Sequence, residues 1–268
     1  MESTIEEVEK FAAKVDRAAE RVFASASIGN TETQLGGDDP KIIAQLLLIR
    51  TLSNFRGTVI LLRTDRIVEA RTIARCCFEN WFTLAALSKD GQRLISEMHE
   101  DRKASQKARA ECLMQQTREM AERGWEPKLR ASIASLGKGQ TKGKLLDPKQ
   151  LAARGQLSQS YVYYADLTAD AAHATLDALS RYQDHAQEGS ETTWTVELNP
   201  PVDPAERRMT LMMVCEALLG VCVGVKVILE LQRPIINGEL GALMLEYQTL
   251  GSSDMLVWER PEGDQSGG

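Results

Sequence analysis

Aromatic residues are scarce in this chain of 268 residues, since Phe, Trp and Tyr together make up 5% of it. Strands favour aromatic and β-branched residues, so the composition argues against a predominantly β fold. Good helix formers such as Ala, Leu, Glu, Arg and Met are plentiful instead. The composition therefore predicts an all-α protein.

Cysteine is also sparse, and its five positions contain no CxxC pair: Cys76, Cys77, Cys112, Cys215 and Cys222. An odd number of cysteines in a chain of this length argues against a disulfide framework. No Cys and His pair has the spacing of a zinc finger. We therefore expect no metal and no cofactor, and we expect reduced thiols, as in the cytoplasm.

Positive and negative charges are nearly balanced, since 32 Lys and Arg residues stand against 38 Asp and Glu residues, which gives a net charge of −6 at pH 7. This balance argues against broad, non-specific binding of nucleic acids, although basic residues gather in one stretch, 128–154. The one long apolar run, residues 211–231, contains Glu216 and Lys226. Each of these charges would cost about 2.5–3.5 kcal/mol near the centre of a bilayer. We therefore expect the central helix of a cytoplasmic bundle, with no membrane partner.

Common catalytic signatures are missing as well. The stretch "GKGQTKGK" is similar to a phosphate-binding loop, but only three residues separate Gly139 from Gly143, where that loop needs four. Leu145 also stands where a magnesium-binding Ser or Thr is required. The sequence contains no HExxH or GxSxG pattern either.

Start and stop signals divide the chain into helices and predict one helical domain over residues 1–260 with a disordered tail at 261–268. Ser3 or Thr4 caps a first helix, which could be peripheral, and Asp39 and Asp203 each precede a Pro that opens a helix. "TTWTVELNPP" and "SSDMLVWERPE" have strand-like composition and could pair as one late β-hairpin. The predicted helices are 3–27, 40–63, 66–88, 91–122, 156–164, 169–183, 205–231 and 237–250, with 66–88 and 205–231 at the centre of the bundle.

The predicted helix 66–88 carries an unexpected line of charges. Arg71, Arg75 and Glu79 follow one another at intervals of four residues, opposite a broad apolar arc. Three interpretations remain open: a solvated face, a structural buried ion pair, or a functional pocket. Helix stability alone is a weak explanation, because a pair at this spacing contributes only about 0.2–0.5 kcal/mol.

A second group of polar residues lies in "YVYYADLTADAAHATLDALSRY", residues 161–182. Here Thr168 is predicted to cap a helix, and His173 lies at the edge of that helix's apolar stripe. Asp177 could orient the His173 imidazole, and Tyr164 supplies a hydroxyl nearby. A histidine in such a place can also be an ordinary hydrogen-bonded core residue.

Arg75 and Glu79 in "ARCCFENW", together with Thr168 and His173 in "YADLTADAAHAT", resemble the two signature blocks of a helical family, domain of unknown function 5677. The similarity covers about residues 40–235, and this chain has Thr168 where the family has serine. The resemblance implies an all-α fold in which the Arg–Glu pair and the histidine come together. It implies no established activity.

If these residues meet, they suit binding of a phosphate-bearing ligand such as RNA or a nucleotide, and its metal-independent cleavage. His173 would act as base or acid, Arg71 and Arg75 would hold the anion, and Glu79 would fix Arg75. A gene beside toxin, antitoxin or phage-defence components would favour this hypothesis.

Two alternatives to this site remain. Arg93 and His99 have the spacing of the catalytic pair in HEPN-type ribonucleases, but the polar residue that usually follows the Arg is absent. The other alternative is a non-enzymatic interaction protein whose Arg/Glu/His cluster is structural. In that case helix 91–122 would mediate a homodimer or the binding of a partner.

Overall fold

Three helices begin at an Asp-Pro pair: α2 (Pro40–Arg63), α6 (Pro148–Arg154) and α9 (Pro204–Ile228). In each, the Asp side chain accepts a hydrogen bond of 2.7–3.0 Å from the backbone N–H two residues on. Pro occupies the first helical position, where its missing N–H costs nothing. The starts of α2 and α9 are as predicted, whereas α6 was not predicted.

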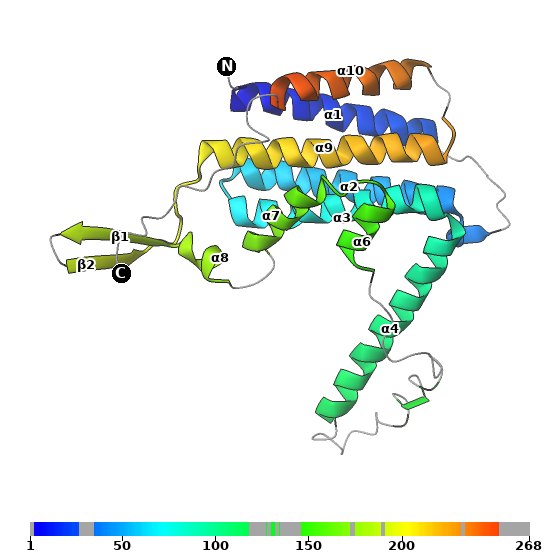
Figure 1. The fold of residues 1–268 in the computed structure, drawn as a ribbon, viewed down its shortest axis with the longest axis horizontal. Helices are drawn as coiled ribbons and strands as arrows, with labels where there is room; N and C mark the ends of the chain where they lie inside the picture. The colour runs from blue at the N-terminus through cyan, green and yellow to red at the C-terminus, as the bar shows by residue number, and fades with distance from the viewer. Residues whose placement is uncertain are drawn as a thin grey trace.

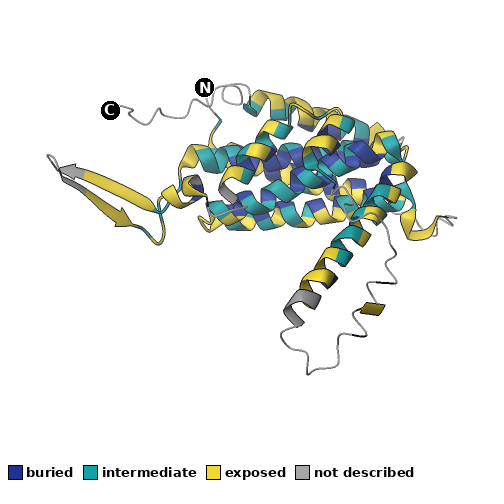
Figure 2. Ribbon diagram, turned by 60° about the horizontal axis from the view of Figure 1, so that its bottom comes forward, coloured by how far each residue is buried: buried dark blue, intermediate teal, exposed yellow. Residues whose placement is uncertain are grey.

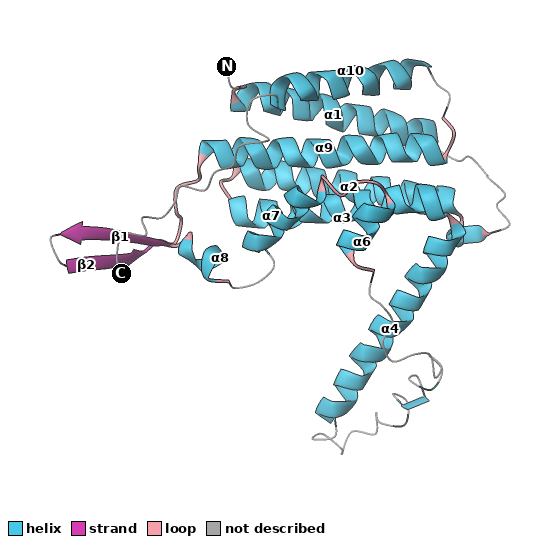
Figure 3. Ribbon diagram, viewed as in Figure 1, coloured by secondary structure: helices cyan, strands magenta, loops and turns pink. Residues whose placement is uncertain are grey.

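The structure is a computed structural model, and it describes residues 3–26, 35–117, 127, 130–131, 134, 146–171, 175–188, 191–231 and 234–251. Within these residues the regular elements are helices apart from one two-stranded sheet, which confirms the predicted all-α class (Figure 3). Besides the three helices above, it contains α1 (Ile5–Ala26), a 3₁₀ turn η1 (Gly36–Asp38), α3 (Ile67–Asp90), α4 (Gln92–Thr117), α7 (Tyr161–Ala171), α8 (Leu176–Ser180) and α10 (Pro234–Gly251).

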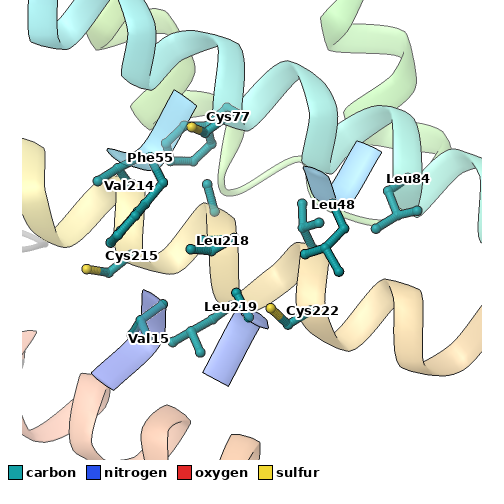
Figure 4. Packing of buried hydrophobic residues seen from close by; sticks show 14 of the residues in the cluster. Val15, Leu48, Phe55, Cys77, Leu84, Val214, Cys215, Leu218, Leu219 and Cys222 are labelled. Atoms are coloured by element: carbon teal, nitrogen blue, oxygen red, sulfur yellow. The ribbon is translucent and has the colours of Figure 1, made fainter. Parts of the chain in front are cut away.

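Helix α9 lies at the centre of the bundle, with α1 and α10 on one side and α2 and α3 on the other (Figure 1). Figure 4 shows its buried residues between Val15 of α1, Leu48 and Phe55 of α2, and Cys77 of α3. Among the described helices, α9 alone is long and apolar enough to cross a membrane, and 61% of its most apolar window is buried in the bundle. Such burial is what a core helix shows.

Helices α3 and α9 approach each other closely because α9 has glycine on the facing side. A Cβ at Gly220 would lie 2.1 Å from the Trp81 ring, and one at Gly224 would lie 2.8 Å from the Leu84 side chain. Helices α6 and α7 then pack on α3, whereas α4 extends away from the bundle (Figure 1). The predicted central pair of helices is therefore the observed one.

The β-hairpin consists of β1 (Gln183–Glu188) and β2 (Glu191–Val196), paired antiparallel. It projects beyond the end of the bundle and is exposed along its length where it is described (Figure 2). We predicted β2 but gave it the wrong partner, because the polar sequence of β1 has no strand signal. The segment predicted as its partner, 252–262, lies outside the described residues.

The region before the hairpin also differs from the prediction. The single helix α7 spans the end of the predicted helix 156–164, the gap after it and the start of the predicted helix 169–183. The separate short helix α8 follows, and Thr175 caps it through a 3.1 Å hydrogen bond from the Ala178 N–H. Helix α4 is described from Gln92 to Thr117, and residues 118–122 of the predicted helix lie outside the described residues.

Candidate functional site

Arg71 is buried, with 2% of its side chain exposed, and it ties three helices together. Its Nη2 donates to the Asp166 carboxylate at 2.8 Å and to the Asp166 backbone oxygen at 3.2 Å, both on α7. Its Nη1 lies 3.5 Å from Glu206 Oε1 and 3.5 Å from Thr210 Oγ1, both on α9. Arg71 is therefore a structural clasp between α3, α7 and α9, and not part of an open pocket as we had proposed.

The Arg71 clasp extends to the base of the hairpin. Arg181, which follows α8, donates two hydrogen bonds to Glu206, one of them 2.8 Å long. Two arginines and the carboxylates of Asp166 and Glu206 thus form a cluster that is neutral overall. Burial of charge is tolerable here because each charge faces an opposite one.

Arg75, one turn after Arg71, has a different environment. Its side chain is 25% exposed, and its Nη2 lies 3.5 Å from Glu79 Oε1. The guanidinium carbon is 5.9 Å from the centroid of the Tyr164 ring, within reach of a cation–π contact. Its buried Nε has no hydrogen-bond partner among the described residues. The Arg71 Nε is likewise buried without a hydrogen-bond partner within these residues, so the two arginines differ in their terminal nitrogens: those of Arg71 donate to Asp166 and Thr210, whereas those of Arg75 make one ion pair of 3.5 Å.

Tyr164 of α7 connects the Arg75–Glu79 pair to the next helix. Its hydroxyl donates to Glu79 Oε1 at 3.2 Å, and burial followed by the Glu79 charge raises the pKa of this phenol. The hydroxyl therefore stays protonated and can act as a donor at neutral pH. Arg75, Glu79 and Tyr164 thus lie together, while their role as a shared ligand site stays a prediction.

Thr168 does not cap a helix, because α7 already begins at Tyr161 and Thr168 lies within it. Its Oγ1 instead donates to the Tyr164 backbone oxygen at 2.7 Å. This hydrogen bond within one helix occupies the hydroxyl, as is common for Thr inside helices. Thr168 therefore lies one turn after Tyr164 inside α7 and does not mark the start of a helix.

The Cys76 thiol of α3 lies near two guanidiniums and one carboxylate. Burial and then the Glu79 charge raise the pKa of the half-buried Cys76 thiol, and the nearby cations Arg75 and Arg50 of α2 oppose them. Two guanidiniums and one carboxylate therefore act on this short stretch of surface. Such a surplus favours an anionic ligand.

The remaining predicted site residues are not brought into this group by the described structure. His173 lies outside the described residues, and Asp177 lies in α8, where its side chain is not described. On α4, Arg93 pairs with Glu97 at 3.3 Å and His99 Nε2 lies 3.0 Å from Asp38 Oδ1, so each has its own partner on the surface. No cluster of acidic, His and Cys residues within the described ranges could hold a metal ion.

Sequence reasoning missed Asp166, Glu206 and Arg181. Asp166 and Glu206 are 95 and 135 residues away from Arg71 in the sequence, and no local pattern marks them as its partners. We also did not predict a cavity of about 790 Å³ at the turn between α2 and α3. It contains none of the predicted site residues and is lined in part by Arg66, Tyr182 and Pro200.

A family model, described as a family of unknown function (DUF5677), matches residues 41–191, which is more than half of the chain. The matched segment contains Arg71, Arg75, Glu79 and Tyr164, but not Glu206 or Thr210. No curated protein and no solved structure matches the chain.

Proposed function

The chain belongs to the DUF5677 family, whose activity is unknown, and we propose that it binds a phosphate-bearing ligand, an RNA or a nucleotide, on the outer face of α3. The observation that carries the proposal is the contrast between Arg71 and Arg75. The terminal nitrogens of Arg71 lie beside two carboxylates and donate to Asp166 and Thr210, whereas those of Arg75 have one carboxylate, at 3.5 Å, within the described residues.

The chemistry of the three described residues suits such a ligand. A guanidinium presents parallel N–H donors that match two oxygens of a phosphate group. Glu79 lies on the next turn of α3 and pairs with Arg75, and the Tyr164 ring lies 5.9 Å from the Arg75 guanidinium carbon. Arg50 adds positive charge from α2. A phosphate oxygen of the ligand would take the place of Glu79 Oε1 as the partner of Arg75 Nη2.

The proposal extends to cleavage when the ligand is RNA. His173, two residues after the end of α7 in the sequence, would take the proton of the 2′-hydroxyl. The 2′-oxygen would then bond to phosphorus while the bond from phosphorus to the 5′-oxygen breaks, and that oxygen would take up a proton. Arg75 would stabilise the additional negative charge of the phosphorane. No metal is needed for this step.

Binding is tested by titrating the full chain with adenosine monophosphate and with a short fluorescent RNA. Arg75→Ala should weaken binding about 10- to 100-fold, because a hydrogen bond to a charged group contributes about 1.5–3 kcal/mol. Arg207→Ala is the matched control, since Arg207 of α9 is 26% exposed, close to the 25% of Arg75, and likewise has one carboxylate partner, Asp65 at 3.1 Å. Equal affinity of Arg75→Ala and the native chain would refute the site.

Cleavage is tested separately with the His173→Ala variant. This variant should bind RNA with the native affinity and leave the RNA intact, whereas the native chain should produce a 2′,3′-cyclic phosphate. If the native chain binds RNA and yields no such product, the binding proposal stands and the cleavage step is wrong.

A second candidate function is that of a non-enzymatic interaction protein whose charged cluster is structural. The burial of Arg71 in a neutral cluster favours this candidate. If this candidate is right, replacing Arg75 should not change the affinity for any phosphate-bearing ligand. Replacing Arg71 should greatly lower the free energy of unfolding. The homodimer through helix 91–122 stays a prediction. The cytoplasmic location stays a prediction as well.

A further inference from the structure

Helix α10 has a row of uncharged residues on its outer side. Ile235 and Leu245, the two large members of the row, are 82% and 66% exposed, and Met244 beside them is 48% exposed. A Cβ at Gly238, between Ile235 and Leu245, would find open space. Single exposed apolar residues are ordinary on a protein surface, but several together on one helix mark a surface that binds a partner.

The row has the spacing of a face that pairs with another helix. Its five members are all exposed, follow one another at alternating intervals of three and four residues, and fall within an arc of about 80°: Ile235, Gly238, Ala242, Leu245 and Thr249. We call these five residues the outer seam of α10. Alternating intervals of three and four residues keep one side of a helix against a second helix.

The only two charged residues of α10 lie beside the outer seam and are paired with α1. Glu239 pairs with Arg21, and Glu246 pairs with Lys14 at 2.7 Å. The outer seam can therefore be buried without moving a charge out of water. A helix that packs on it should be uncharged along its own contact face, as α10 is.

The outer seam is complementary to itself when two copies run antiparallel. Ile235 and Leu245 lie five residues on either side of Leu240, and Gly238 and Ala242 lie two residues on either side. A two-fold axis level with Leu240 therefore places Ile235 of one copy beside Leu245 of the other. It also places Gly238 beside Ala242, so the small residues lie where the two helices are closest.

The charges next to the outer seam are complementary in the same arrangement. The two ion pairs show that α1 and α10 run antiparallel, with Arg21 level with Glu239 and Lys14 level with Glu246. Arg17 lies on the same side of α1 and has no ion-pair partner among the described residues. The two-fold axis brings Glu239 of the second copy to a level between Arg21 and Arg17, where Arg17 can pair with it.

We propose that two copies of the chain associate through the outer seams of their α10 helices, in antiparallel orientation. Helix α10 forms an outer edge of the bundle, away from α4, so the two copies can meet there (Figure 1). At 18 residues α10 is about 27 Å long, and a contact about 10 Å wide along it covers about 300 Å². Stable interfaces bury about 800 Å² per partner, so this dimer is weak, with a dissociation constant on the order of 100 µM. The proposal is independent of the phosphate-binding site.

Sedimentation equilibrium of the full chain, from about 10 µM to about 1 mM, tests the proposal. The native chain should form a dimer, and Ile235→Asp and Leu245→Asp should each weaken it by about tenfold or more. Leu46→Asp is the matched control, because Leu46 is an exposed leucine on α2, at 54%, and this variant should leave the dimer unchanged. Circular dichroism verifies that each variant is folded.

The variant Gly238→Leu distinguishes close helix packing from general stickiness. The larger side chain has open space in the single copy but would separate the two helices in the dimer, so association should weaken by about tenfold or more. A stronger dimer would overturn the proposal, because added apolar surface would then be what drives association.

Disulfide trapping tests the orientation, with Cys112→Ser in every chain because Cys112 is exposed. A mixture of Ile235→Cys chains and Leu245→Cys chains should form cross-linked dimers, and neither variant should do so alone. Cross-linking of each variant with itself alone would mean parallel helices and would overturn the proposal.

Charge provides the last measurement. Arg17→Glu should weaken the dimer, and added salt should weaken the native dimer more than this variant. A chain that stays monomeric up to about 1 mM would overturn the proposal. So would a dimer that neither Ile235→Asp nor Leu245→Asp affects, because its interface would then lie elsewhere, for example on α4.

Discussion

Replacement of Arg71 by methionine tests whether the clasp between α3, α7 and α9 is as important as its burial indicates. Methionine keeps much of the side-chain volume but removes the charge, and so leaves two carboxylates without this partner. Breaking a buried ion pair by removing one side costs about 3–5 kcal/mol. Asp166 is 30% exposed and Glu206 retains Arg181, so the lower end of that range applies.

We therefore expect Arg71→Met to lower the free energy of unfolding by about 3 kcal/mol. For a chain of this size the melting temperature should fall by about 6–12 °C. Urea unfolding followed by circular dichroism measures the free energy, and a thermal scan measures the midpoint. Arg75→Met is the control: its side chain is partly exposed and has one long ion pair, so its removal should cost less than about 1 kcal/mol.

The double variant Arg71→Met with Asp166→Asn identifies the source of the cost. If the unpaired Asp166 carboxylate causes the loss, its neutralisation should make the double variant more stable than Arg71→Met alone. Equal losses for Arg71→Met and Arg75→Met would refute the reasoning, because they would mean that burial of Arg71 adds nothing to its contribution.

Two further predictions concern α9. Burial raises the pKa of Glu216, against the hydrogen bonds from Tyr247 and Ser160, so the folded chain holds a proton that the unfolded chain releases above about pH 4.5. Native stability should therefore fall as the pH rises above that value, and Glu216→Gln should remove this part of the pH dependence in urea titrations, whereas an unchanged slope would contradict the assignment. Gly220→Ala should destabilise the chain by about 1–3 kcal/mol through its clash with Trp81. Gly241→Ala in α10, where a Cβ has open space, should stabilise it by about 0.5–1 kcal/mol, and equal thermal shifts for the two variants would contradict the close approach of α3 and α9.

The helices that could be predicted are those with local signals. An Asp-Pro pair determines the starts of α2 and α9, and Thr4 exchanges hydrogen bonds with Glu7 at the start of α1. The same signal at Asp147 was missed because the glycine-rich, basic stretch before it suggested a loop. Thr168 was misassigned for the opposite reason, since a residue that often caps helices lies inside one here.

The site was predictable only in part. The four-residue interval placed Arg75 and Glu79 on one face of α3, and the structure brings Tyr164, which was expected near His173, to Glu79. The sequence could not distinguish Arg71 from Arg75, because the difference depends on Asp166 and Glu206, which belong to other helices. Long-range pairing of this kind follows from the packing of α7 and α9, which no local pattern encodes.

The central position of α9 has a consequence for how the family segment can exist as a protein. The matched residues, 41–191, end before α9 begins at Pro204. Excised alone, they would expose to water the faces of α2 and α3 that pack on α9, and Arg71 would lose Glu206 and Thr210 as partners. We therefore expect residues 41–191 of this chain not to fold without α9, whose apolar side chains complete their core.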